Sequence, residues 1–191
     1  MELAVKKPRD LGLDPDLLEE AWILLVNGAQ AHAYGGAVAL VLRHGQIALH
    51  RATGWAVREP EEERSPAGVD TIFDLASLTK VTATLPSILR LVAEGRVGLD
   101  QPVGELLPAF GTAGDKREVT IRRLLSHAAG LVSWLPVFLE ATGPEAYVAA
   151  FARTQPERTP GAQVVYSDPG FILLGEVVRQ VTGESVAGYA R

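Results

Sequence analysis

The chain has 191 residues, of which 47% are hydrophobic and 21% charged, and its 23 acidic and 18 basic residues give a formal net charge of −5. This length predicts one domain, or one and a fraction, and this composition excludes a disordered chain. The acidic balance leaves no basic surface for phosphates, which argues against a nucleic-acid partner. The absence of cysteine excludes disulfides, thiolate metal sites and a cysteine nucleophile.

The first ten residues do not have the pattern of a signal peptide. Lys6 and Lys7 are followed by Pro8 and further polar residues rather than by an apolar segment. The longest apolar runs, such as residues 36–42, are far shorter than the roughly 20 residues that a membrane span needs. We therefore expect a cytoplasmic protein without a membrane span.

Residues 1–70 predict a helix followed by a β-hairpin. The dipeptide Asp14-Pro15 combines a favoured N-cap with a favoured first helical residue, and apolar residues at helical spacing continue to Asn27-Gly28. Residues 36–42 and 47–55 predict two strands joined by a short glycine-bearing turn. A hairpin alone is marginally stable, so the pattern implies a larger sheet whose other strands this chain lacks.

Residues 71–191 predict mainly helices and no further sheet. Pro86 lies inside the first of these helices and predicts a bend, and Asp168 before Pro169 predicts the N-cap of the last long one. We expect an α/β (α+β) fold in two parts, residues 1–70 and residues 71–191, with an exposed acidic loop at residues 58–65. The expected helices in the second part cover residues 77–94, 103–107, 120–125, 144–152 and 168 onward.

The tetrapeptide Ser77-Leu78-Thr79-Lys80 is the first feature that could carry chemistry. With seven serines and four lysines in the chain, chance predicts roughly 0.14 matches to this S-x-x-K spacing. A serine at a helix N-terminus lies where free N–H groups stabilise an oxyanion, and a lysine one turn later can accept its proton. The alternative is that Ser77 caps the helix and Lys80 is a surface residue.

Four segments in a fixed order extend this motif. The segments are FDLASLTK (73–80), LVAEGRVGLD (91–100), TIRRLLSHAAGL (120–131) and YSD (166–168). Their series closely resembles the penicillin-recognising serine hydrolase family, which includes class C β-lactamases, D-alanyl-D-alanine peptidases and related esterases. The similarity runs from about Gly36 to Arg191. It implies a β-lactamase/transpeptidase-like fold of which this chain is the N-terminal portion, without the C-terminal strands.

The resemblance implies a role for each matching residue. Ser77 would be the nucleophile that forms an acyl-enzyme, Lys80 would assist its deprotonation, and Tyr166 would carry protons to or from the leaving group. For Tyr166 the alternative is a half-buried aromatic of an extended segment. His127 would be mainly structural, with a catalytic role as the alternative. The other histidines have no ligand-like spacing, so we expect neither a metal site nor a cofactor.

The sequence departs from the family pattern at Asp168, where the family's Y-x-N motif has asparagine. An ionised carboxylate cannot donate the hydrogen bond that the asparagine amide gives to a substrate, and it favours the charged form of Lys80. We expect Asp168 to contact substrate and to weaken recognition of β-lactams and peptides more than of simple esters. In that case Tyr166 carries more of the proton transfer, or Asp168 itself relays protons. The alternative is that Asp168 only caps the following helix.

A second departure is that no K-T-G or H-x-G element follows Tyr166. In the family this element lies on a strand opposite the nucleophile, and the strand supplies one of the two oxyanion N–H donors. Loss of one such donor lowers kcat by about 10²–10³-fold. We therefore expect an impaired site in this chain.

The sequence supports three hypotheses about function. The first is a serine hydrolase that transfers the acyl group of an ester, β-lactam or D-amino-acid peptide to water through Ser77. The second is a non-catalytic remnant or binding module. The third is one half of a two-chain enzyme, in which the unpaired sheet edge joins a complementing C-terminal chain or a second copy of this chain.

Overall fold

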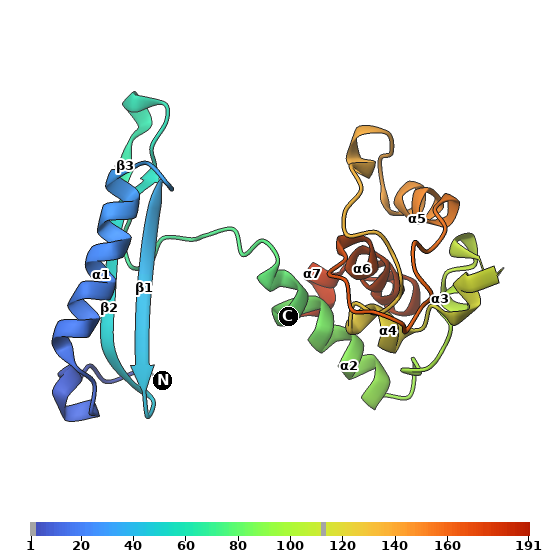
Figure 1. Cartoon of the computed structure of the whole chain (residues 1–191), viewed down its shortest axis with the longest axis horizontal. Coiled ribbons are helices and arrows are strands. Elements are labelled where there is room, and N and C mark those ends of the chain that lie inside the picture. Colours follow the sequence, from blue (N-terminus) through green and yellow to red (C-terminus); the bar gives the residue numbers. More distant parts are fainter. Residues whose placement is uncertain (1–2, 112–113) are drawn as a thin grey trace. The chain divides into compact units, whose positions relative to one another are not determined.

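A computed structural model describes residues 3–111 and 114–191. The chain divides into two compact units, unit 1 (Met1–Asp74) and unit 2 (Leu75–Arg191), which are described separately (Figure 1). Unit 1 combines a helix with a small sheet, and the regular elements described in unit 2 are helical. Among the described residues, no helix combines the length and the apolar character needed to cross a bilayer.

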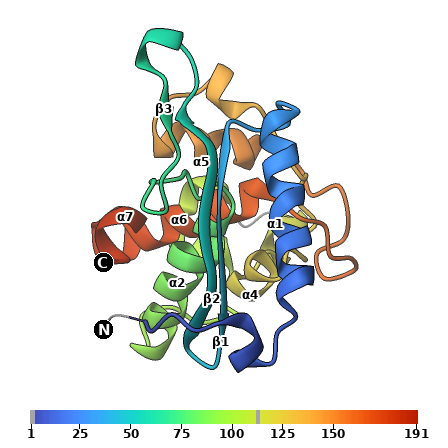
Figure 2. The same ribbon diagram turned by 90° about the vertical axis from the view of Figure 1, so that its left-hand side faces the viewer.

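Unit 1 consists of helix α1 (Pro15–Gln30) packed on an antiparallel sheet (Figure 2). The strands β1 (Gly36–Arg43), β2 (Gln46–Val57) and β3 (Ser65–Pro66) lie in the order β1-β2-β3. Asp14 caps α1 as predicted, because its side chain accepts hydrogen bonds from the N–H groups of the helix's first turn. The predicted helix and hairpin are therefore confirmed.

Close backbone approach fixes the pairing at one end of this hairpin. Gly36 pairs with Gly54, and a Cβ atom on Gly36 would lie 2.4 Å from the carbonyl oxygen of Trp55. Only glycine fits there, so the register of β1 on β2 is set at this position. β1 itself lies at an edge of the sheet. The short helical turns of unit 1 are η1 (Pro8–Leu11) and η2 (Glu61–Glu63).

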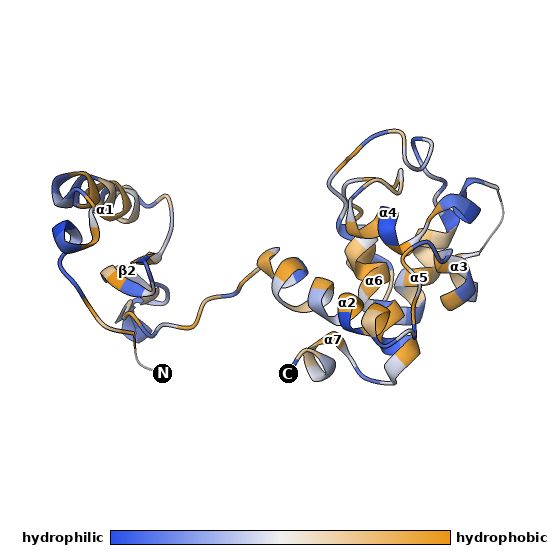
Figure 3. Cartoon of the chain, turned by 90° about the horizontal axis from the view of Figure 1, so that it is seen from below, coloured by the Kyte–Doolittle hydropathy of each residue, from blue (hydrophilic) through white to orange (hydrophobic). Residues whose placement is uncertain are grey.

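Unit 2 packs its helices around α6 (Asp168–Thr182), whose Leu173, Leu174, Val177 and Val178 are fully buried. The hydropathy colours of Figure 3 show apolar residues on α6 and on helices around it within unit 2. The other α-helices of this unit are α2 (Leu85–Ala93), α3 (Val103–Leu106), α4 (Ile121–Leu125), α5 (Pro144–Arg153) and α7 (Val186–Tyr189). The shorter turns are η4 (Pro108–Phe110), η5 (Gly114–Glu118) and η6 (Val137–Leu139).

The predicted long helix at residues 77–94 is present, with an irregular turn before its proline. The turn η3 (Lys80–Thr84) is π-helical, and the Leu85 N–H donates to the carbonyl of Lys80, five residues back. Pro86 follows at once and has no N–H to donate. The sequence predicted a bend at Pro86, and the structure has a π-helical turn directly before this proline.

The prediction that Asp168 caps the last long helix is wrong. Ser167 is the N-cap of α6, and its Oγ accepts a hydrogen bond from the Gly170 N–H. Asp168 is the first helical residue, and its side chain pairs with Lys80 instead. Pro169 is tolerated in the first turn because the N–H groups there have no helical partner.

Candidate active site

Ser77 stands at the point where an extended segment turns into the helix that leads to α2. The preceding residue, Ala76, has a φ of 44°, a left-handed conformation that is rare for a residue with a Cβ atom. Hydrogen bonds from the N–H groups of Thr79 and Lys80 to the carbonyls of Ala76 and Ser77 then form the first turn. The strained backbone thus presents an exposed serine at a helix N-terminus.

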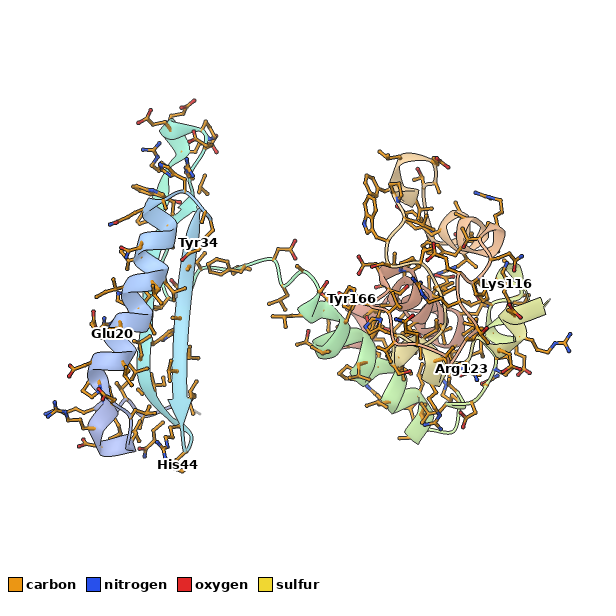
Figure 4. All side chains as sticks on the ribbon, viewed as in Figure 1. Glu20, Tyr34, His44, Lys116, Arg123 and Tyr166 are labelled. Atoms are coloured by element: carbon orange, nitrogen blue, oxygen red, sulfur yellow. The ribbon has the colours of Figure 1, made fainter. Side chains whose placement is uncertain are left out.

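Two side chains, those of Tyr166 and Lys80, contact the Ser77 hydroxyl. The Tyr166 hydroxyl is hydrogen bonded to Ser77 Oγ at 2.7 Å, and Lys80 Nζ donates to the same oxygen at 3.1 Å. Lys80 reaches Ser77 from one turn along the helix. Tyr166, which is labelled in Figure 4, comes from the segment before α6, 89 residues away from Ser77 in the sequence. A hydroxyl with a phenol and an amine within hydrogen-bond reach has the arrangement of an activated nucleophile.

Lys80 also forms an ion pair with Asp168. Its Nζ lies 2.7 Å from Asp168 Oδ1, an oxygen shielded from solvent, and the contact lacks the directionality of a hydrogen bond. The Lys80 side chain is only 15% exposed, and its amine lies 5.0 Å from the ring centroid of Tyr166 and 5.8 Å from that of Phe171. These partners hold the amine in place as a cation.

The charges of this cluster shift two pKa values in opposite directions. Burial by itself lowers the pKa of Lys80, but the interactions with Asp168 and Tyr166 outweigh it and raise that pKa. The contact with Lys80, followed by the one with Ser77, lowers the pKa of Tyr166. Lys80 is therefore favoured as a cation and Tyr166 becomes the more acidic phenol, so Tyr166 is the better proton carrier of the two.

His127 joins the loop after α4 to the segment that carries Tyr166. Its Nδ1 accepts a hydrogen bond from the Ser167 N–H at 3.1 Å, and its carbonyl accepts one from the Val165 N–H at 2.8 Å. The imidazole lies 4.7 Å from the Tyr166 ring, centroid to centroid. Burial, followed by the charge of Lys80, lowers the pKa of His127. These contacts suit a neutral imidazole that positions Tyr166.

Two cavities of unit 2 border the cluster. One, of about 500 Å³, is lined by Ser77 and Tyr166 among mainly aliphatic side chains. The other, of about 420 Å³, is lined by Lys80, Asp168 and several aromatic side chains. Lys80 lines both of them, so the amine lies between two spaces of a size typical for small ligands.

A serine, a lysine and a tyrosine in this arrangement agree with the family that the sequence resembles. The family model described as Beta-lactamase matches residues 23–191. The chain belongs to the Beta-lactamase family. The predicted resemblance and the predicted fold class are thereby confirmed.

The proteins to which this chain is similar include enzymes with different activities. Esterase EstB of Burkholderia gladioli is 47% identical over 111 residues, which cover 56% of this chain and 26% of the esterase. The solved structure of EstCE1, a hydrolase with promiscuous acyltransferase activity, superimposes with a TM-score of 0.76 at 28% identity, covering 91% of this chain and 49% of that one. For a class C β-lactamase of Rhodobacter sphaeroides the TM-score is 0.71 at 27% identity, with coverages of 89% and 46%.

The chain spans only part of these relatives. It covers 26%, 40% and 38% of the lengths of the first three curated relatives.

All four residues singled out from the sequence lie in one cluster, namely Ser77, Lys80, Tyr166 and Asp168. In residues 3–111 and 114–191, no three side chains of His, Cys, Asp or Glu lie close enough together to hold a metal ion.

Sequence reasoning missed two features of the site. Ser167 caps α6 and also donates its hydroxyl to the Val132 carbonyl at 2.7 Å, which ties the Tyr166 segment to the loop after α4. Its signal was present, since serine is a strong N-cap and proline is accepted in the first helical turn. The aromatic pair Trp134 and Phe138 lines the smaller cavity. Trp134 lies in the loop before η6 and Phe138 lies in η6 itself, and no periodic pattern marks them.

Proposed function

We propose that unit 2 carries the nucleophile and proton-transfer groups of a serine hydrolase that acts on esters. The observation that supports this most directly is that Ser77 Oγ is hydrogen bonded to both Tyr166 Oη and Lys80 Nζ. Tyr166 would act in its phenolate form, which its lowered pKa favours. Ser77 Oγ would attack the ester carbonyl while its proton passes to this phenolate. Tyr166 would then give that proton to the alkoxide that leaves, and an acyl-enzyme on Ser77 would remain.

The second half of the reaction uses the same groups in reverse. Water would attack the acyl-enzyme, Tyr166 would take one proton from it, and the Ser77 oxygen would recover a proton as the acid product leaves. In both halves Lys80 stays protonated, because Asp168 holds it as a cation. The fixed positive charge of Lys80 stabilises Tyr166 whenever the phenol has lost its proton.

Esters fit this site better than amides or β-lactams. An ionised Asp168 cannot donate a hydrogen bond to a substrate carbonyl, so recognition that depends on such a donor is weakened. An ester does not need a strong acid to expel its leaving group, and a tyrosine with a lowered pKa is sufficient. The esterase among the relatives agrees with this preference.

The test is hydrolysis of a p-nitrophenyl ester and of nitrocefin, combined with intact mass spectrometry. We expect ester hydrolysis and a transient acyl adduct on Ser77, and we expect Ser77→Ala to abolish both. Ser126→Ala is the matched control, since this serine is also in unit 2 and donates to the backbone carbonyl of Arg122. An adduct or an unchanged rate in Ser77→Ala would refute the proposal. A chain that binds ester without any adduct would favour the binding-module alternative.

A two-chain arrangement is the second candidate. β1 is an edge strand, and its Leu40 and Leu42 are 48% and 42% exposed. An edge strand with apolar side chains favours pairing with a further strand, from a complementing chain or a second copy. Light scattering should then give a mass above 20.4 kDa at micromolar concentration, and Leu40→Lys should return it to that of a monomer. A monomer at all concentrations that purifies without any second chain would reject this candidate.

A further inference from the structure

The helix that carries Ser77 and Lys80 contains one residue more than a regular α-helix would before it reaches α2. In an α-helix each N–H donates to the carbonyl four residues back, whereas the Leu85 N–H donates to the Lys80 carbonyl, five residues back. One extra residue rotates everything before it by about 100° around the helix axis, relative to α2. The direction in which Lys80 points therefore depends on the π-helical turn η3.

This rotation exchanges Val81 for Lys80 on the buried face of the helix. Val81 lies seven residues before the fully buried Ile88, and in an unbroken α-helix seven residues return to within about 20° of the same face. A regular helix would therefore place Val81 on the buried face. In the structure Val81 is 54% exposed, and the Lys80 side chain is only 15% exposed and contacts Asp168. The extra residue thus puts Lys80 where the apolar pattern would put Val81.

Pro86 is the residue that opposes the regular helix. The regular arrangement would bury the apolar side chain of Val81, and it would need an N–H at residue 86 for the carbonyl of Thr82. Proline has no N–H, and its ring clashes with the carbonyl four residues back. With η3 in place, Pro86 becomes the second residue of α2, where an N–H has no helical partner.

We infer that Pro86 is a positioning residue, which maintains η3 and thereby aligns Ser77 and Lys80 with Tyr166 and Asp168. This inference rests on the proposed function, because it takes Ser77 as the nucleophile. Pro86 is exposed and acts through the backbone between it and Lys80. Ser77 and Lys80 both precede the turn, so its loss would rotate them together, away from the two residues at the beginning of α6.

The first experiment measures kcat/KM for a p-nitrophenyl ester in Pro86→Ala. The new N–H permits the regular helix, so we expect kcat/KM to fall by about 10- to 100-fold through misplacement of the reacting groups. Pro144→Ala is the matched control, because Pro144 is also an exposed proline in the first turn of a helix in unit 2. It should leave kcat/KM unchanged. An unchanged kcat/KM in Pro86→Ala, or an equal loss in Pro144→Ala, would overturn the inference.

A labelling measurement tests the turn without any need for turnover. The chain has no cysteine, so Val81→Cys introduces a single thiol whose reaction rate with Ellman's reagent reports whether position 81 is exposed. Adding Pro86→Ala should move the thiol to the buried face and slow its reaction by about tenfold. Equal rates with and without Pro86→Ala would overturn the inference, even if kcat/KM falls. If the rates differ but Ser77→Ala hydrolyses the ester at the parent rate, the proposed function fails and the positioning role fails with it.

Deletion of Ala83 provides a rescue. Removed from the Pro86→Ala chain, Ala83 takes the extra residue with it, so an unbroken α-helix again places Lys80 on the face of Ile88. We expect the deletion to restore most of the lost kcat/KM and the fast reaction of the thiol at position 81. A kcat/KM that stays at the level of Pro86→Ala would overturn the inference, because the register of the helix would then not determine activity.

Discussion

Unit 1 and unit 2 stabilise their secondary structure in different ways. The described hydrophobic core cluster lies entirely within unit 2 and is built around α6. In unit 1 the buried hydrophobic side chains among the described residues are Leu11 and Leu49, and α1 contributes none. Unit 1 therefore depends mainly on the backbone hydrogen bonds of its hairpin and on a partly buried helix, whereas unit 2 has a packed interior.

The difference explains why the candidate chemistry belongs to unit 2. Catalytic groups must be held within a fraction of an ångström, and that precision requires side chains locked by packing. Tyr166 directly precedes the buried helix α6, and Ser77 begins the helix that continues into buried residues of α2. Both hydroxyls are thus attached to elements that the core fixes in position.

The largest expected effect comes from Tyr166→Phe, which removes the proposed proton carrier from the packed unit. We expect kcat/KM for a p-nitrophenyl ester to fall by about 10²–10⁴-fold, the usual contribution of general acid–base catalysis. Tyr34→Phe is the matched change in unit 1, where the Tyr34 hydroxyl donates to the Leu25 carbonyl at 2.6 Å. It should lower stability slightly and leave kcat/KM within twofold. Equal losses of kcat/KM in Tyr166→Phe and Tyr34→Phe would contradict the assignment of the chemistry to unit 2.

The second prediction compares the two units by stability. Leu174→Ala, in the core of unit 2, should lower the free energy of unfolding by about 2–5 kcal/mol, because it leaves a cavity among fully buried side chains. Leu24→Ala, at a position of α1 that is 71% exposed, should change it by less than about 0.5 kcal/mol. Urea denaturation measures both. Hydrogen exchange should also be faster in α1 than in α6, and the reverse order would contradict the comparison.

A third prediction tests how the charge of Asp168 affects the pKa of Lys80 within unit 2. Asp168→Asn removes the charge that helps to raise the pKa of Lys80, so Lys80 loses its proton at lower pH. The alkaline limb of the pH profile of kcat/KM should move to lower pH. The new amide can also donate a hydrogen bond to a substrate. The ratio of kcat/KM for nitrocefin to kcat/KM for the ester should therefore increase.

The control for this change is Asp100→Asn, which breaks the ion pair with Arg122 elsewhere in unit 2. It should change neither the alkaline limb of the pH profile of kcat/KM nor the preference between nitrocefin and the ester. If Asp168→Asn also leaves them unchanged, Asp168 does not tune Lys80.

Sequence patterns between neighbouring residues predicted most of the helices and strands, and they predicted the Ser77–Lys80 part of the site. Asp14-Pro15 marked the beginning of α1, and the S-x-x-K spacing placed Lys80 beside Ser77, because both patterns involve neighbours within one helical turn. Tyr166 reaches Ser77 across 89 residues, a distance at which spacing carries no information, and it was identified by resemblance to a family.

The ion pair of Asp168 and the cavity wall were unforeseen for the same physical reason. The N-cap rule sees only the chain near Asp168, and the nearby charge of Lys80 comes from another helix. Trp134 and Phe138 likewise acquire their role from the cavity they line, which forms only when the loop after α4 packs near α6. A contact between distant segments leaves no local pattern in the sequence.

The smallest expected effect concerns the pH dependence of stability at His127. Because the folded state lowers the pKa of His127, the unfolded chain binds a proton first as the pH falls. The stabilisation is complete above the unfolded pKa of about 6.5 and is lost as the pH falls through the lower folded value. Protonation at Nδ1 would also remove the acceptor for the Ser167 N–H. The free energy of unfolding should therefore decrease between pH 7 and pH 5.

His127→Asn separates this titration from the structural role of the residue. Asparagine tolerates the φ of 56° found at this position and offers an acceptor oxygen to the Ser167 N–H, but it does not titrate. The variant should fold and should lose less stability than the parent between pH 7 and pH 5. The control in unit 1 is His44→Asn, at an exposed turn residue with a φ of 52° and no part in the packed core. Since the packing of unit 2 causes the shift at His127, only His127→Asn should flatten the pH dependence, and an equal flattening by His44→Asn would contradict that cause.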